Sequence, residues 1–491
     1  MSIYGLLVDE GMHYPRVDGR FRPNVAYPEY PFEISTLSHS DNTIYEGVRR
    51  LLQITGLDAE NFETALWNPL GAYIQPGDRV LVKPNLVMDV NPSGHGVDCL
   101  YTHPSVIAAV IDYVIIAQRG EGSIILGDAP MQTCNFEKLT DQSGLRSLVD
   151  WYCSQGIDIK LVDLRGLRSS DESNGLNQKI VDGVDGRVVD LGTDSSFHGL
   201  TEERLERLRI TNYDPRELSK HHSLDRHEYC ISRHLLDADV IVNLPKAKTH
   251  RKAGITGALK NMVGINVRKE YLPHHTFGSK EQGFDEYEKR SLLRTASSAL
   301  LDAKNRTLGR DSNLLRSVLS YSSKAVGALG KRLSGDTKSE GSWSGNDTIW
   351  RTVLDLNMIV RYADHNGIMR STKQREMIAI TDMVVIGQGE GPLLPEPGKW
   401  GMLSFSDSPV VSDVAMSRLL GTDKAAIPSI GQTLSHEGAF KIADSRSSSV
   451  ICKSNDIKYN GIAVGALNEN VFKAAKPTSG WLSAFKRNAV C

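Results

Sequence analysis

Short apolar runs bounded by turn residues recur along the first third of the chain. Such runs lie at 79–82, 106–117 and 123–126, and the middle one follows Pro104. The outer two are short and rich in aliphatic and β-branched residues, as strands are, and a proline is common at the first position of a helix. We therefore predict a strand–helix–strand unit, which implies a parallel sheet with a right-handed crossover.

Further runs of the same character lie at 159–162, 240–244, 378–386 and 402–405. We predict an α/β fold with mostly parallel sheets built from βαβ units, arranged as two α/β lobes with a ligand site between them. In open sheets of this class, ligands bind beyond the carboxyl ends of the strands. The polar residues that follow the predicted strands are therefore the first candidates for a functional site.

Composition changes along the chain, and the stretch 304–347 is the clearest case. It is rich in Ser, Gly, Lys and Arg, with helically spaced apolar residues between Leu314 and Leu333. This pattern fits a surface helix followed by a flexible loop, and it also fits a helix that contacts a membrane surface or a protein partner. We predict these segments: an irregular lead-in at 1–41, a first α/β lobe at 42–163, a polar insertion at 164–222, a second α/β segment with a lysine-rich motif at 223–303, a basic flexible insertion at 304–347, an α/β segment with an acidic motif at 348–435 and a C-terminal extension at 436–491.

The overall composition excludes several classes of protein. The formal net charge is -2, so we expect no nucleic-acid partner. The six cysteines include no C-x-x-C pair, so we expect no iron–sulfur cluster. The start of the chain lacks the pattern of a secretory signal, and no apolar run approaches the roughly 20 residues of a spanning helix, so we expect a cytoplasmic protein.

A lysine-rich segment after the predicted strand 240–244 is the densest group of polar candidates. It alternates lysines with hydroxyl, histidine and glycine residues, without the spacing of a Walker motif. Lysine suits phosphate or carboxylate, and glycines let backbone amides approach an anion. A basic surface loop is the alternative. The candidates here are Asn243, Lys246, Lys248, Thr249, His250, Lys260 and Asn261.

A second group follows the two strands of the predicted βαβ unit. Lys83 and Asn85 come at the end of the first strand, His103 precedes the helix, and Asp128 ends the second strand. A lysine and an amide at a strand end fit the rim of a ligand site. An exposed lysine and a histidine that caps the helix would give the same pattern. His274 and His275 lie in a loop without metal-binding spacing, where we favour a solvated or structural role, with a loop over the site as the alternative.

A third group is acidic. Asp355, Asp382 and Asp413 are spread over the predicted segment 348–435, and carboxylates suit magnesium (Mg²⁺), which commonly bridges protein oxygens to a phosphate. Glu390 lies between glycines and is an acid–base candidate, with a simple turn as the alternative. This glycine-rich loop lacks the helix and distal acid of a dinucleotide fingerprint. We therefore expect neither NAD nor flavin.

Taken together, these segments resemble the family named domain of unknown function 362. The resemblance rests on the motifs around Lys83-Pro84-Asn85, Thr102-His103-Pro104, Gly127-Asp128, Asn243 to His250, Leu259-Lys260-Asn261, Asp355 and Glu390, and it spans roughly 75–430. It implies no defined activity. Many members carry a ferredoxin-like cysteine cluster that this chain lacks, and similar long forms often accompany polysaccharide genes. The architecture is also distantly similar to nickel-pincer lactate racemases, but their histidine pattern has no match here.

These observations favour an enzyme that binds a small anionic substrate, phosphorylated or carboxylated, such as a nucleotide sugar of cell-surface polysaccharide metabolism. His250, Glu390 and Lys248 are the candidates for proton transfer. Lys248 is included because neighbouring lysines depress one another's pKa, so that one of them can act as a base. The alternative is a non-catalytic ligand-binding or scaffold protein that associates with a membrane assembly through 304–347.

Overall fold

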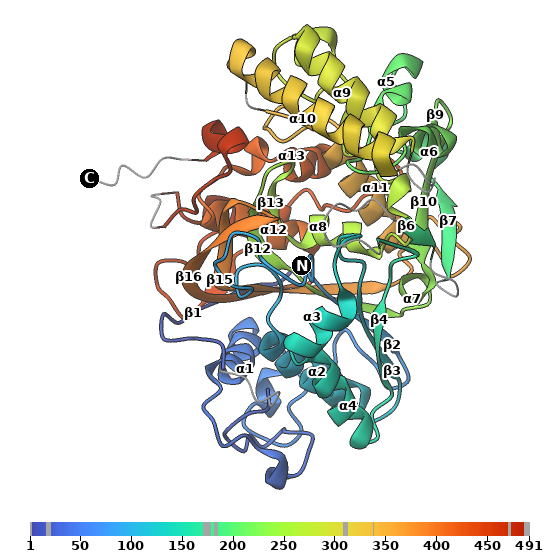
Figure 1. Cartoon of the computed structure of the whole chain (residues 1–491). Helices are drawn as coiled ribbons and strands as arrows, with labels where there is room; N and C mark the ends of the chain where they lie inside the picture. The colour runs from blue at the N-terminus through green and yellow to red at the C-terminus, as the bar shows by residue number, and fades with distance from the viewer. Residues whose placement is uncertain are drawn as a thin grey trace.

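A ten-stranded mixed sheet forms the centre of the molecule (Figure 1). The computed structural model describes residues 2–15, 21–169, 178–180, 185–307, 313–336, 338–469 and 473–485. Five neighbouring strands are parallel, in the spatial order β4 (Ile159–Asp163), β3 (Ser123–Asp128), β2 (Arg79–Pro84), β11 (Val240–Leu244) and β15 (Glu376–Glu390). The predicted α/β fold with a mostly parallel central sheet is confirmed, and strands from 42–163, 223–303 and 348–435 all join this one sheet.

Beyond β15 the sheet is no longer purely parallel. β16 (Leu394–Ser406) pairs antiparallel with β15, β1 (Tyr4–Val8) pairs antiparallel with β16, and β17 (Cys452–Ser454) pairs parallel with β1. The first strand of the chain therefore lies beside a strand near residue 400.

The alternating side chains of the parallel strands separate two hydrophobic cores. Val80 and Val82 of β2 pack into one core, and Leu81 packs into the other. Helices α1 (Thr43–Thr55), α2 (Pro104–Gln118) and α4 (Leu145–Ser154) cover the first face, and α11 (Ile349–Tyr362), α12 (Pro409–Leu419) and α13 (Pro428–Ser435) cover the second (Figure 1). Strands buried on both faces read as continuous apolar runs, which is why these strands were visible in the sequence.

The lysine-rich segment after the predicted strand 240–244 forms two further strands. After Pro245 the chain continues as β12 (Lys246–His250), which pairs parallel with the second half of β15, and β13 (Gly254–Thr256) pairs antiparallel with β12. The long strand β15 provides the hydrogen-bonding edge that makes this possible. The short helix α8 (Ala258–Asn261) and the 3-10 helix η4 (Met262–Ile265) follow at the carboxyl edge of the sheet.

An antiparallel helical hairpin, α9 (Leu292–Asn305) and α10 (Asn313–Ser334), lies beyond α8 and α11 (Figure 1). No helix in the described ranges is long and apolar enough to cross a membrane. The other elements are α3 (Phe136–Gln142), β5 (Leu167–Ser169), β6 (Gln178–Ile180), β7 (Gly186–Asp190), α5 (Glu202–Glu206), β8 (Leu208–Arg209), α6 (Pro215–His221), β9 (His222–Ser223), β10 (Arg226–Ser232), α7 (Arg233–Leu236) and β14 (His275–Thr276).

Candidate functional site

A cavity of about 820 Å³ lies at the carboxyl edge of the parallel strands. Its floor comes from the residues after β2 and β3 and from the segment β12 to η4, and its roof comes from the α9–α10 hairpin. Nine lysine and arginine residues line it against three carboxylic acids. The cations are Lys248, Arg251, Lys252, Lys260, Lys269, Arg294, Lys304, Lys324 and Lys331, and the acids are Asp128, Glu286 and Glu340.

Of the three acids, only Glu340 forms an ion pair with one of the lining cations. Asp128 forms an ion pair of 2.6 Å with Lys83, and Glu340 pairs with Arg251 at 3.3 Å. Burial raises the pKa of Glu286 to about 7, so that a large fraction of this side chain is neutral near pH 7. Basic side chains therefore outnumber ionised acids in the lining of the cavity.

Lys83 supports the floor from behind and does not line the cavity. Its ammonium group is fully buried and contacts Asp128, the carbonyl oxygen of Pro84 at 2.8 Å and Asn261 Oδ1 at 3.3 Å. A buried charge needs such partners. Gly264 is required beside this pair, because a Cβ at its position would lie 2.1 Å from Asp128 Oδ1 and 2.7 Å from Lys83 Nζ.

A chain of side-chain amides connects the ends of β2 and β11 with helix α8 under the cavity. Asn261 Nδ2 donates to Asn243 Oδ1 at 2.8 Å and to the carbonyl oxygen of Lys83 at 3.1 Å, while Asn85 Nδ2 donates to Asn261 Oδ1 at 3.1 Å. Lys248 in turn donates to Asn85 Oδ1. These bonds fix Asn85, Asn261 and Lys248 at the floor, where all three line the cavity.

Lys260 is the most available to a ligand among the lysines that the segment β12 to η4 contributes to the cavity. Within the described part of the chain its ammonium group has no hydrogen bond or ion pair, whereas Lys252 donates to Thr211 Oγ1 at 3.1 Å and Lys269 donates to the carbonyl oxygen of Ala129 at 2.7 Å. Burial, followed by the charges of Lys269 and Lys252, lowers the pKa of Lys260 to about 7. Burial likewise lowers the pKa of Lys252 and that of Lys269 to about 8, and it lowers the pKa of Lys248 strongly.

Two neutral histidines of opposite tautomer line the same cavity. The backbone amides of Lys252 and Ala253 donate to His250 Nδ1 at 3.0 and 3.2 Å, so the ring proton sits on Nε2. His274 Nδ1 lies 2.7 Å from the carbonyl oxygen of Leu272, so this nitrogen carries the proton and Nε2 keeps a lone pair. Burial holds the pKa of both rings well below the usual range. His250 is thus a hydrogen-bond donor and His274 an acceptor.

Comparison with protein families agrees with the resemblance seen in the motifs. The model of a domain of unknown function (DUF362) matches residues 80–185 and 190–418, which is more than half of the chain. The chain belongs to the DUF362 family. The matched ranges contain Asn85, Lys248, His250 and Lys260, so the floor of the cavity is part of the family domain.

One curated relative is the thylakoid-associated protein sll1697 of Synechocystis sp. (strain ATCC 27184 / PCC 6803 / Kazusa). It is 28% identical over 195 residues, which cover 40% of this DUF362 chain and 41% of the relative. The match therefore spans less than half of either protein. No solved structure matches this chain.

The acidic candidates of this DUF362 protein lie in three separate networks. Asp382 accepts from Tyr14 at 2.7 Å and pairs with Lys246 at 3.0 Å, with both charged side chains fully buried. Asp413 accepts the backbone amides at the start of α8, and Asp355 accepts from Ser195, Ser196 and Tyr229. In the ranges that the structure describes, no group of three or more His, Cys, Asp or Glu residues could hold a metal ion.

Three other sequence candidates also lie outside the cavity. Glu390 is exposed and accepts the backbone amide of Ser479 at 2.7 Å. Thr249 donates to the carbonyl oxygen of Gly389 at 2.9 Å. His103 caps α2 by accepting from the amide of Ser105 at 3.2 Å, and it stacks on Tyr14 with ring centroids 3.9 Å apart. Burial lowers the pKa of His103 to about 3, so the ring is neutral.

The cavity also contains residues that we did not select from the sequence. Lys252 follows His250 by two positions and could have been found from the same basic run. Lys269 and the hairpin residues Lys304 and Lys331 carry no local signal, since only the folding of distant segments over the sheet edge brings them to the cavity.

Proposed function

We propose that this DUF362 protein is an enzyme that binds a small phosphorylated or carboxylated molecule in the cavity. The observation that carries the proposal is the excess of lysine and arginine over acidic side chains around one cavity, with Lys260 lacking a partner in the described part of the chain. Positive charge in a partly desolvated cavity attracts anions much more strongly than the same charge on an exposed surface.

The size of the cavity suits a nucleotide sugar or a sugar phosphate. Its volume of about 820 Å³ lies in the range of roughly 300–1,000 Å³ that is typical of small-molecule sites. Floor residues Asn85 and Asp128 come from the first predicted lobe, and Lys248 and Lys260 come from the next α/β segment. This arrangement supports a ligand site between the two segments.

The proposed chemistry is proton transfer. A group with a pKa near the working pH is an efficient acid or base, and Lys260, with its pKa lowered to about 7, meets that condition. His250 would donate from Nε2 to a ligand oxygen, and Lys248 would bind the anion from the floor. Magnesium stays a prediction, and we propose that it enters together with a ligand phosphate.

The test is a thermal-shift screen of the full chain against sugar phosphates, nucleotide sugars, nucleotides and hydroxy acids, with and without Mg²⁺. A ligand at about 100 times its Kd should stabilise the fold by roughly 2.7 kcal/mol. The double substitution Lys252→Met and Lys260→Met should abolish the shift, whereas Lys441→Met, which removes an exposed lysine outside the cavity, should preserve it. A shift that survives the double substitution would place the ligand elsewhere, and silence across the panel would contradict the proposal.

A second candidate is a ligand-binding or scaffold protein without catalytic activity. The relative is a thylakoid-associated protein, which favours association with a membrane assembly over a freely diffusing cytoplasmic protein. Turnover of a ligand found in the screen would decide between the two candidates.

A further inference from the structure

Helix α10 of the α9–α10 hairpin has its polar side toward the protein and its apolar side toward solvent. Leu314, Tyr321 and Leu333 of α10 are 82%, 74% and 71% exposed, and Leu292 at the start of α9 is 82% exposed. Leu315, Val318 and Leu329 are each at least half exposed. The opposite side of α10 lines the cavity with Ser320, Ser323, Gly327 and Lys331. Surface helices of globular proteins normally bury their apolar stripe, so the orientation of α10 is inverted.

The two helices contact each other through small and polar residues. Ser297 Oγ donates to the carbonyl oxygen of Ser323 at 2.8 Å, and Ser323 Oγ donates back to the carbonyl oxygen of Ser297 at 2.9 Å. A Cβ at Gly327 would lie 2.7 Å from Ser297 Oγ, which shows how closely the helices approach. The large apolar side chains of α10 are therefore not needed to hold the helices together.

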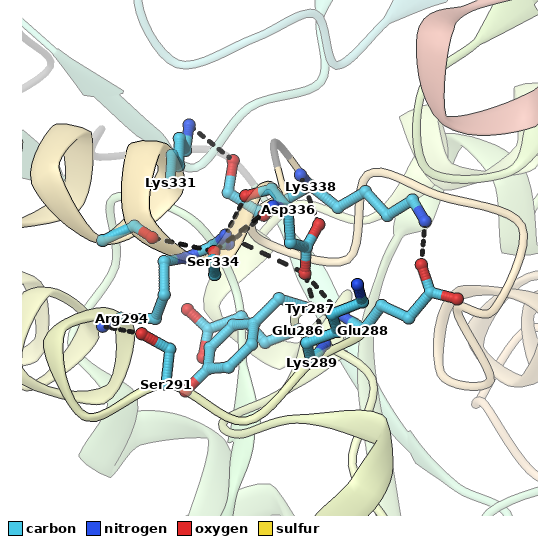
Figure 2. Close-up of polar contacts among 12 residues, drawn as sticks. Glu286, Tyr287, Glu288, Lys289, Ser291, Arg294, Lys331, Ser334, Asp336 and Lys338 are labelled. Atoms are coloured by element: carbon cyan, nitrogen blue, oxygen red, sulfur yellow. Dashed lines mark hydrogen bonds and ion pairs between the residues drawn. The ribbon is translucent and has the colours of Figure 1, made fainter.

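The base of the hairpin is fixed by polar contacts around Arg294, which Figure 2 shows. Arg294 is 4% exposed and donates to the carbonyl oxygens of Asp336, at 2.6 Å, and of Lys338. The Asp336 carboxylate accepts the backbone amides of Glu288 at 3.0 Å and Lys289 at 3.3 Å. These contacts join the chain that enters α9 to the chain that leaves α10, so the hairpin keeps its position while its outer apolar face stays free.

The charge around this face indicates what covers it. Residues 289–334 include ten Lys or Arg residues and two Asp residues. Five of these cations lie away from the outer face, since Arg316 is buried and the other four line the cavity: Arg294, Lys304, Lys324 and Lys331. Arg290 and Arg332 are exposed next to the outer apolar side chains, whereas Asp302 is 9% exposed and paired with Arg209. An apolar helix face flanked by cations is the pattern of a helix that lies in the interface of an anionic bilayer.

We propose that the outer face of the α9–α10 hairpin docks this protein onto an anionic lipid membrane surface. The apolar side chains of α10 enter the boundary between headgroups and acyl chains, and the flanking arginines contact anionic headgroups. Because the hairpin is also the roof of the cavity, docking holds the cavity next to the membrane. The proposal does not depend on the identity of the ligand in the cavity.

The test is flotation of the full chain with vesicles of phosphatidylcholine alone and of phosphatidylcholine mixed with phosphatidylglycerol. Wild type should bind the mixed vesicles more tightly, and the triple substitution Leu314→Ser, Val318→Ser and Leu329→Ser should weaken that binding by at least about tenfold. Arg290→Glu with Arg332→Glu should remove the preference for the anionic lipid. The control, Leu66→Ser with Ile457→Ser, changes side chains that are 76% and 89% exposed elsewhere and should bind as wild type does.

Thermal unfolding should show the same stability for the triple variant, since its three side chains are exposed and absent from the cavity lining. The proposal is wrong if wild type binds neither vesicle or if the folded triple variant floats as wild type does. It is also wrong if wild type is a dimer without affinity for vesicles and the triple variant is monomeric, since the apolar face would then bind a second copy of the chain.

Discussion

Two lysines at the edge of the central sheet show how the surroundings of a residue decide its role. Lys83 and Lys260 both follow from the same kind of motif, a lysine near the carboxyl end of a strand. Lys83 is paired with Asp128 at 2.6 Å and carries structure, whereas Lys260 lines the cavity and has no partner among the described residues. Burial lowers the pKa of both, but only Lys260 keeps an ammonium group that a ligand can reach.

Replacing Lys83 by Met should destabilise the protein strongly, by about 3–5 kcal/mol, because it leaves the Asp128 carboxylate buried without its partner. Urea unfolding measures the loss. The double substitution Lys83→Met with Asp128→Asn should recover a large part of it, since the uncompensated charge is gone. Equal losses in the single and double variants would show that the ion pair is not the cause.

The affinity for an anionic ligand should fall as the pH rises through about 7. Lys260, whose folded-state pKa is about 7, loses its charge in this window.

The same depressed pKa also affects stability, because the unfolded chain binds more protons than the folded chain between about pH 7 and 10.5. The charged Lys260 therefore lowers the free energy of unfolding at low pH, and this cost disappears as the pH rises toward 10.5. Lys260→Met should therefore bind the anionic ligand at least about tenfold more weakly than wild type at pH 6, and its affinity should depend less on pH. The same variant should unfold at a higher temperature than wild type at pH 6. Calorimetric titration and thermal unfolding from pH 6 to 10 measure both effects, and an unchanged pH profile in Lys260→Met would contradict the assignment.

At the scale of elements, β12 and the α9–α10 hairpin position the site. β12 exists because the second half of β15 extends beyond β11 and offers an edge to Lys246 and Lys248. Arg294 and Asp336 hold the base of the hairpin together, and polar contacts such as the ion pair between Asp302 and Arg209 at 3.0 Å join it to the rest of the molecule. Polar attachment of this kind is strong only while its buried partners remain complete.

Arg294→Met should loosen the hairpin without unfolding the sheet. The substitution removes two donors from the carbonyl oxygens of Asp336 and Lys338, and we expect the free energy of local opening in α9 and α10 to fall by about 2 kcal/mol. Hydrogen exchange measures this as faster exchange in α9 and α10 with unchanged protection in β2, β3 and β11. The exposed Arg332→Met is the matched control, and equal protection in both variants would show that Arg294 does not hold the hairpin.

At the scale of the whole molecule, one sheet collects polar groups from segments far apart in the chain. Strands β2, β3 and β11 end at the same edge, the helices cover both faces, and the hairpin encloses the space above the edge. The result is a cationic cavity on one side of the hairpin and an apolar, cation-flanked surface on the other. This arrangement combines the proposed ligand site with the proposed membrane contact.

Local patterns in the sequence determined the α/β class, the strands around residues 80, 125 and 242, the start of α2 at Pro104 and the lysine-rich segment near the sheet edge, because apolar periodicity and proline act over a few residues. Only the tertiary structure decided which lysine is paired and which is available, that Asp355, Asp382 and Asp413 belong to separate networks, and that α10 faces solvent with its apolar side. Pairing, burial and pKa depend on atoms that lie up to hundreds of residues away in the chain. Those contacts exist only once the strands have aligned and the hairpin has closed over their carboxyl ends.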